Sequence, residues 1–182
     1  ESAAVMQESL TIARGISNER RKTKALSEIS IRLSKQGQVA ESLAIARGIS
    51  DEIIKSDALL EISIRLSKQG QVVESLVIAQ GISDVRIKSC ALSEISIELG
   101  KQGQVEESLA IARGISDIWD NSNALSKISI ELIKQGPADK SAAVMQELLA
   151  VARGISDERM KTSALREISI ELRKQGLLEE SF

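Results

Sequence analysis

Pairs of charged residues recur along the chain, and they are the first candidates for a functional site. The members of each pair are four residues apart, so both side chains would lie on one face of a helix. The pairs are Glu28/Arg32, Glu61/Arg65, Glu94/Glu98, Lys127/Glu131 and Glu167/Glu171. The first, second and fourth pairs can form ion pairs, whereas the like charges of the third and fifth repel slightly. This ladder predicts either a surface that binds charged groups or a solvated face that favours solubility.

The residue types that most often serve as general bases, thiol nucleophiles and zinc ligands are nearly missing. The 182 residues include no His and no Tyr, and Cys90 is the only cysteine. Cys90 shares its repeat position with Lys24, Asp57, Asn123 and Ser163, which predicts an exposed thiol without a cationic cluster to activate it. One cysteine also excludes an internal disulfide. We predict no catalytic residue, no cofactor site and no metal site, and we expect that the protein is not an enzyme.

Composition and charge limit the partners. Hydrophobic residues make up 42% of the chain and charged residues 27%, which is typical of a folded protein. The formal charge of −2 disfavours a dedicated nucleic-acid binder. No apolar run approaches the length that a membrane span needs, and no apolar signal segment opens the chain. We therefore expect a protein or peptide partner, no nucleic acid and no membrane, and a cytoplasmic location.

Two tripeptides repeat through the whole chain. Gly-Ile-Ser begins at Gly15, Gly48, Gly81, Gly114 and Gly154. Lys-Gln-Gly begins at Lys35, Lys68, Lys101, Lys134 and Lys174. Both sets are spaced by 33, 33, 33 and then 40 residues, a period that is typical of helical arrays. The period also equals three times 11, which would suit a right-handed coiled coil. Two glycines per repeat, each followed by capping residues, favour helical hairpins instead.

Each repeat reads as a longer helix followed by a shorter one. In the second repeat, Ala58, Leu59, Ile62 and Leu66 form one apolar stripe of the segment 50–69, and the segment 71–80 is shorter. Both glycines of each repeat are expected to adopt a left-handed conformation at a helix end. The Ser of Gly-Ile-Ser is expected to cap the next helix. The repeats would then join at about residues 17, 50, 83, 116 and 156.

The pattern of these helices resembles the tetratricopeptide repeat. That family's pattern is Trp-x2-Leu-Gly-x2-Tyr, then Ala-x3-Phe and Pro, over 34 residues. The second repeat matches it with Leu59, Ile62, Ser63 and Leu66, followed by Ser75 and Ala79. Serine stands where the family has glycine, which predicts a close approach of the two helices. The aromatic residues and the closing Pro are absent, and the period is one residue shorter, so pentatricopeptide, Sel1-like and other hairpin arrays stay open.

The resemblance implies an all-α fold in which about five hairpins over residues 1–182 form a right-handed solenoid. It also implies a non-enzymatic scaffold that holds peptides or partner domains on its concave face, with the charge ladder as the floor of that groove. Its later, acidic part would suit basic peptide groups. Two alternatives stay open: a structural module that assembles through its ends, and RNA binding in the pentatricopeptide manner.

Trp119 and the chain ends add two further expectations. Trp119 either anchors a partner in the groove or packs against the neighbouring repeat. A longer second helix that begins with Pro137 would explain the 40-residue step. The array looks cut at both ends, so we expect a fragment of a longer array. End-to-end or swapped contacts between copies would then cover the apolar residues there, which are Val5, Leu10, Leu177, Leu178 and Phe182.

Overall fold

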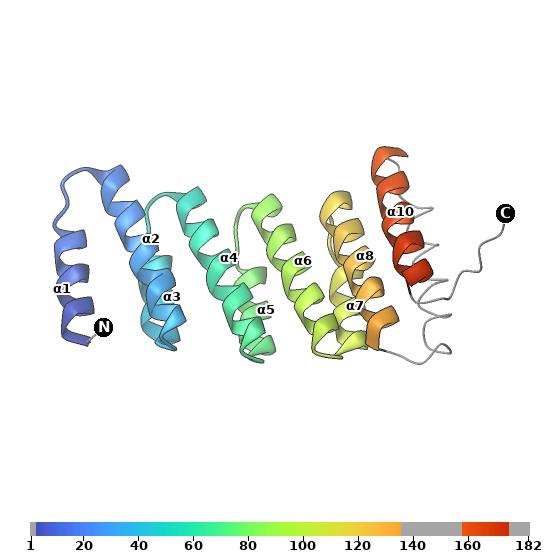
Figure 1. Cartoon of the computed structure of the whole chain (residues 1–182). Helices are drawn as coiled ribbons and strands as arrows, with labels where there is room; N and C mark the ends of the chain where they lie inside the picture. Colours follow the sequence, from blue (N-terminus) through green and yellow to red (C-terminus); the bar gives the residue numbers. More distant parts are fainter. Residues whose placement is uncertain (1–2, 136–157, 175–182) are drawn as a thin grey trace. The chain divides into compact units, whose positions relative to one another are not determined.

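The computed structural model describes residues 3–135 and 158–174, and within them every regular element is an α-helix (Figure 1). Long helices of 17 or 18 residues alternate with shorter ones. The helices are α1 (Ala3–Arg14), α2 (Glu19–Lys35), α3 (Val39–Arg47), α4 (Glu52–Lys68), α5 (Val72–Gln80), α6 (Val85–Lys101), α7 (Val105–Arg113), α8 (Ile118–Gln135) and α10 (Glu158–Lys174). The predicted all-α fold is confirmed, and its helices end where the repeated glycines stand.

The chain divides into two compact halves, residues 1–91 and 92–182, and the division falls within α6. In the N-terminal half, α2 packs against α3, α4 packs against α5, and α2 also contacts α1 and α4 (Figure 1). In the C-terminal half, α8 contacts both α7 and α10. Each half therefore consists of helices that pack against their neighbours along the chain. One solenoid through all 182 residues stays a prediction.

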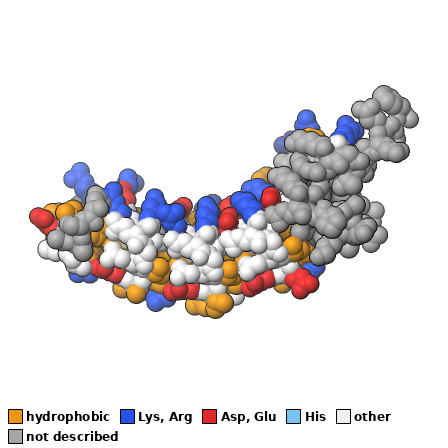
Figure 2. Space-filling model, turned by 60° about the horizontal axis from the view of Figure 1, so that its bottom comes forward, with side chains coloured by type: hydrophobic (Ala, Val, Ile, Leu, Met, Phe, Trp, Pro, Cys, Tyr) orange, Lys and Arg blue, Asp and Glu red, His pale blue; other side chains and the backbone are white. Residues whose placement is uncertain are grey.

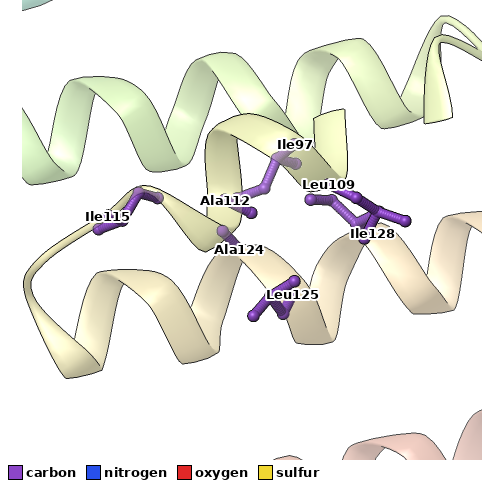
Figure 3. Packing of buried hydrophobic residues seen from close by; sticks show 7 residues of the cluster. All are labelled: Ile97, Leu109, Ala112, Ile115, Ala124, Leu125 and Ile128. Atoms are coloured by element: carbon purple, nitrogen blue, oxygen red, sulfur yellow. The ribbon is translucent and has the colours of Figure 1, made fainter. Parts of the chain in front are cut away.

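The predicted apolar stripe of the long helices is the core. Ala58, Ile62 and Leu66 are completely buried and Leu59 nearly so. In the C-terminal half the same stripe joins the neighbouring helices in one cluster (Figure 3), formed by Ile97, Leu109, Ala112, Ile115, Ala124, Leu125 and Ile128. Every side chain of this cluster is aliphatic, so stability comes from many small contacts rather than from a few aromatic rings.

A repeated serine pair joins the long and the short helix of each hairpin. Ser42 Oγ donates to Ser30 O, Ser75 Oγ to Ser63 O, and Ser108 Oγ to Ser96 O, at 2.7, 2.7 and 2.6 Å. All six side chains are fully buried. A hydroxyl that reaches a main-chain carbonyl of the facing helix requires the two helices to lie close together. The predicted close approach is confirmed, whereas the hydrogen bond itself was not predicted.

Three of the predicted Lys-Gln-Gly glycines end long helices as predicted, whereas Gly136 and Gly176 lie outside the described residues. Gly37, Gly70 and Gly103 have φ angles of 81°, 78° and 79°. The next residue of the second repeat, Gln71, donates its N–H to Leu66 O at 2.9 Å, and Gly70 donates to Ser67 O. These two bonds form a Schellman end, which needs a left-handed residue at the glycine.

The same prediction is wrong for the glycines of Gly-Ile-Ser. Gly48, Gly81 and Gly114 have φ angles of −81°, −78° and −79°, and Gly15 also lacks a positive φ. Gly48 instead donates to Ile45 O, and Ile49 donates to Ala46 O, which tightens the last turn of α3. This turn leads directly into the next helix and buries the Ile that follows, so no left-handed residue is needed. Gly154 lies outside the described residues.

The predicted serine caps are also wrong, because in the four described Gly-Ile-Ser segments the residue after the serine is the cap. Asp51 Oδ1 accepts from the N–H groups of Ile53 and Ile54 at 3.1 and 3.0 Å. The matching residues Asn18, Asp84 and Asp117 each accept one N–H of their first turn. The carboxylates add a favourable interaction with the helix dipole that a hydroxyl lacks.

The two kinds of glycine predict opposite responses to alanine. Gly70→Ala should lower the free energy of unfolding by about 1 kcal/mol, because alanine is strained in the left-handed region. Gly48→Ala should leave it unchanged or raise it slightly, because φ is negative and an added Cβ would lie 3.4 Å from the nearest atom. Urea unfolding monitored by circular dichroism measures both. Equal losses in the two variants would contradict the assignment.

Several predictions concern residues outside the described ones. They are the longer helix after Gly136 with Pro137 at its start, and the apolar C-terminal residues Leu177, Leu178 and Phe182. At the other end, Val5 is about half exposed as expected, but the prediction for Leu10 is wrong. Leu10 is only 4% exposed.

Candidate functional site

The charge ladder occupies equivalent positions on the long helices. Glu28 and Arg32 lie on α2, Glu61 and Arg65 on α4, Glu94 and Glu98 on α6, Lys127 and Glu131 on α8. Glu167 and Glu171 belong to α10, but their side chains lie outside the described part. In the N-terminal half, Glu28, Arg32 and Glu61 are exposed and Arg65 is half-buried. The predicted surface is therefore accessible, and one cation lies deeper in it than the sequence suggested.

A small recess between α2 and α4 holds the second pair of the ladder. Its volume is about 70 Å³, and its walls are formed by Ile31, Ser34, Lys35, Glu61, Ile64, Arg65 and Lys68. Three of these residues are cationic and one is anionic, so the recess has a formal charge of +2. No ion pair within 4 Å joins Glu61 to Arg65, although their spacing allows one.

Two buried donors in this recess lack a hydrogen-bond partner. They are Ser34 Oγ and Arg65 Nε. Ser34 is only 2% exposed. A buried donor without a partner destabilises the protein, because its hydrogen bond to water is lost and not replaced. An acceptor that binds there would remove this cost. The recess is therefore suited to an oxygen acceptor, and its positive charge favours a carboxylate.

The positive charge of this recess follows from the residue types at the helix ends. Long helices have basic last turns, with Arg32 and Lys35 in α2. The short helices α3 and α5 have acidic first turns, with Glu41 in α3 and Glu74 in α5. In the left-hand part of Figure 2, which contains the N-terminal half, Lys and Arg side chains gather mainly along one edge and Asp and Glu side chains along the other. Each sign complements the dipole of its own helix end.

The C-terminal half carries the acidic pair and the tryptophan. Glu94 and Glu98 are half-buried, and Glu98 forms an ion pair with Lys101 at 3.5 Å. Trp119 is 61% exposed and its neighbour Ile118 54%. The interpretation that Trp119 packs against a neighbouring repeat is therefore wrong. In the described structure its ring is available to a partner.

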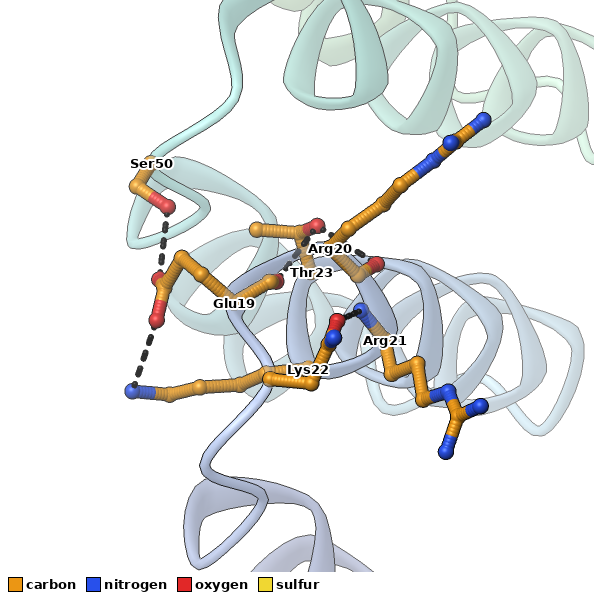
Figure 4. A network of polar contacts seen from close by, with 7 residues as sticks. Glu19, Arg20, Arg21, Lys22, Thr23 and Ser50 are labelled. Atoms are coloured by element: carbon orange, nitrogen blue, oxygen red, sulfur yellow. Dashed lines mark hydrogen bonds and ion pairs between the residues drawn. The ribbon is translucent and has the colours of Figure 1, made fainter.

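Sequence reasoning missed a polar network at the start of the long helices (Figure 4). Glu19 forms an ion pair with Lys22 at 3.7 Å and accepts a hydrogen bond from Ser50 Oγ at 2.9 Å. Ser50 belongs to the Gly-Ile-Ser of the next repeat, so the bond joins successive repeats. The serine that was predicted to cap its own helix thus binds the preceding one. An acidic residue three positions before a lysine, right after the cap, is the signal that could have revealed it.

The second repeat has the same network, and it acts on the pKa of Glu52. Lys55 Nζ donates to Glu52 Oε2 at 2.9 Å. This hydrogen bond, and a weaker effect of one from Ser83, lower the pKa of the Glu52 carboxyl below its ordinary value of 4.5. A lowered pKa in the folded state means that the carboxylate stabilises the fold above pH 4.5. That contribution is lost as the pH falls through the folded-state pKa.

Ser83→Ala should raise the pKa of Glu52, because it removes one of the two hydrogen bonds to the carboxylate. Lys55→Gln should raise it further, because the bond from Lys55 has the larger effect. A carbon-detected NMR titration of the Glu52 side chain between pH 2 and 7 measures both. A larger effect of Ser83→Ala than of Lys55→Gln would contradict this ranking.

The remaining candidates offer little chemistry. Cys90 is half-buried rather than exposed as predicted. Among the described residues, no three His, Cys, Asp or Glu side chains come together as a metal site would require. None of the described helices combines the length and the apolar character of a membrane span. No family model, curated protein or solved structure matches the chain.

Proposed function

We propose that this protein is a non-enzymatic binding module of the tetratricopeptide-like kind. In this proposal its hairpins stack as a solenoid, and the exposed face of the long helices holds a peptide or a partner domain. The charge ladder and Trp119 supply the contacts. The two unpartnered donors of the recess, Ser34 Oγ and Arg65 Nε, are the observation that supports it most.

The recess suggests the chemistry of one partner residue. It accommodates a carboxylate because the volume equals that of about two water molecules in the liquid. An Asp or Glu side chain of the partner would accept from Arg65 and lie near Lys35 and Lys68. Charge-assisted bonds of this kind are stronger than those between neutral groups. Ile31 and Ile64 would contact the apolar part of the same partner side chain.

A synthetic peptide array provides the test. Peptides that bind the protein should contain an acidic residue whose replacement by Asn or Gln weakens binding. Arg65→Gln should raise the Kd of such a peptide at least about tenfold, the effect of losing a charged hydrogen bond. Arg21→Gln is the matched control, since it removes the same charge from an exposed position on α2. Equal effects of the two variants, or binders without acidic residues, would contradict the proposal.

The tryptophan predicts a second, separable contribution. Trp119→Ala should weaken binding of a peptide that contacts the C-terminal half, because exposed aromatic anchors often dominate interfaces. The double substitution Glu94→Lys/Glu98→Lys should weaken the binding of peptides with basic residues and leave the binding of purely acidic peptides unchanged.

A further inference from the structure

One side of helices α1 and α2 is exposed to solvent. By sequence α1 is a short helix, since Glu8-Ser9-Leu10 matches Glu41-Ser42-Leu43 of α3. Ser42 donates to a long helix, whereas Ser9 Oγ donates to Val5 O within α1 at 2.8 Å. Ile12 is 64% exposed, while the matching Ile45 is 7% exposed. In the described structure α1 thus shows the surface that the other short helices bury against a long helix.

The adjoining surface of α2 is open in the same way. Ala25 and Ile29 are half-buried. The residues that match them in the next three long helices are completely buried, namely Ala58, Ala91, Ala124, Ile62, Ile95 and Ile128. A hollow of about 310 Å³ lies here, lined by Ile12 of α1 and by Ala25, Glu28, Ile29 and Arg32 of α2.

The next repeat indicates what kind of element fits this hollow. The equivalent face of α4 lies beside the long helix α2, whose Ile31, Ser34 and Lys35 line one recess together with Glu61 and Arg65. A second long helix in the same register would lie beside Glu28 and Arg32. The occupant suited to the hollow is therefore a long helix of the same repeat type.

The last described helix matches this long helix at two of the three positions and is exposed at one of them. In α10, Ile170 and Lys174 stand where α2 has Ile31 and Lys35, and Arg173 stands where α2 has Ser34. Ile170 is 43% exposed. Ser169 is also exposed, whereas the matching Ser30, Ser63 and Ser96 are fully buried. Two surfaces that elsewhere bury each other are thus both accessible, one on α1 and α2 and the other on α10.

We propose that the open face of α1 and α2 binds α10 of a second copy of this chain, head to tail. Ile170 of the second copy would lie over Ala25 and Ile29, and its Ser169 carbonyl would lie within reach of Ser9. The interface joins two different surfaces, so each copy keeps one surface free and longer chains can grow.

Sedimentation velocity over a range of concentrations tests this assembly. The mean mass should rise above the monomer value with a Kd on the order of 100 µM, since one helix buries a small area. Ile12→Asp and Ile170→Asp should each raise that Kd at least about tenfold. Ile53→Asp is the matched control, because Ile53 is 63% exposed on a different surface, and it should leave the Kd unchanged.

Mixing distinguishes head-to-tail binding from other contacts. Ile12→Asp keeps an intact α10 and Ile170→Asp keeps an intact α1, so an equimolar mixture should form 1:1 dimers and nothing longer. Ser169→Arg should replace Ile170→Asp in this role if the latter loses helicity. The proposal is overturned by a wild-type protein that stays monomeric, by self-association of both single variants, by a mixture that does not dimerise, or by an equal effect of Ile53→Asp.

Discussion

Ile95→Asp is expected to unfold far more than the helix that contains it. Ile95 is completely buried in α6, and an aspartate there would be an unpaired charge in apolar packing. We expect the free energy of unfolding to fall by about 4 kcal/mol, and the melting temperature by on the order of 10 °C. Because each repeat is stabilised by its neighbours, the loss should spread beyond one hairpin. Leu99→Asp, at another fully buried position of α6, should behave alike.

The control for this prediction is Ile118→Asp. Ile118 is 54% exposed in the first turn of α8, where an acidic residue suits the helix dipole. Its melting temperature should stay within a few degrees of the wild-type value. Calorimetry of the three variants would count against neighbour-dependent packing if Ile95→Asp melted at the wild-type temperature.

Ser75→Leu is the second substitution with a large expected effect. Ser75 is fully buried on α5, and its hydroxyl donates to Ser63 O across the hairpin. A leucine would lose this bond and force α4 and α5 apart, at a cost of about 3 kcal/mol. Ser75→Ala loses only the hydrogen bond, so it should cost about 1 kcal/mol. Denaturant unfolding of both variants separates the two contributions.

Ser9→Leu is the matched control for the serine pair. Ser9 has the same place in its repeat, but it is half-buried and donates within its own helix. Its replacement should change the free energy of unfolding by less than about 1 kcal/mol. A loss as large as that of Ser75→Leu would show that the facing long helix is not the cause.

Most of the helical framework could be predicted from the sequence, because the apolar periodicity and the helix-ending glycines indicate the same helices. The buried stripe of Ala58, Ile62 and Leu66 follows from the helical spacing of apolar residues. The left-handed conformation of Gly70 was predicted from its place directly after the Lys-Gln pair that ends the long helix. The all-α fold could be predicted without the aromatic residues of the tetratricopeptide pattern, because every repeat has the same spacing of apolar residues.

The sequence predictions were wrong where two residues were equally suited to a role or had similar sequence contexts. Ser50 and Asp51 are both good caps. Only the structure shows that Asp51 caps α4, while Ser50 binds Glu19 of the preceding repeat. Gly48 and Gly70 look equivalent in sequence, but the three-residue connection after Gly48 closes with a tight turn instead of a left-handed residue.

The charge ladder shows the same limit for the candidate site. Spacing alone placed Glu61 and Arg65 on one face, and both line the recess. It could not show that Arg65 Nε is buried without a partner, because this depends on how α2 covers α4. It could not decide between the two roles of Trp119 either, because its exposure depends on the neighbouring helices.

Methyl NMR with labelled isoleucines tests the proposed binding face most directly. An acidic peptide selected from the array should shift the methyl signals of Ile31 and Ile64, which line the recess, and leave those of Ile45 and Ile78 on the short helices unchanged. Arg65→Gln should abolish these shifts at the same peptide concentration. Shifts confined to the short helices, or shifts at Ile31 and Ile64 that persist in Arg65→Gln, would contradict the account.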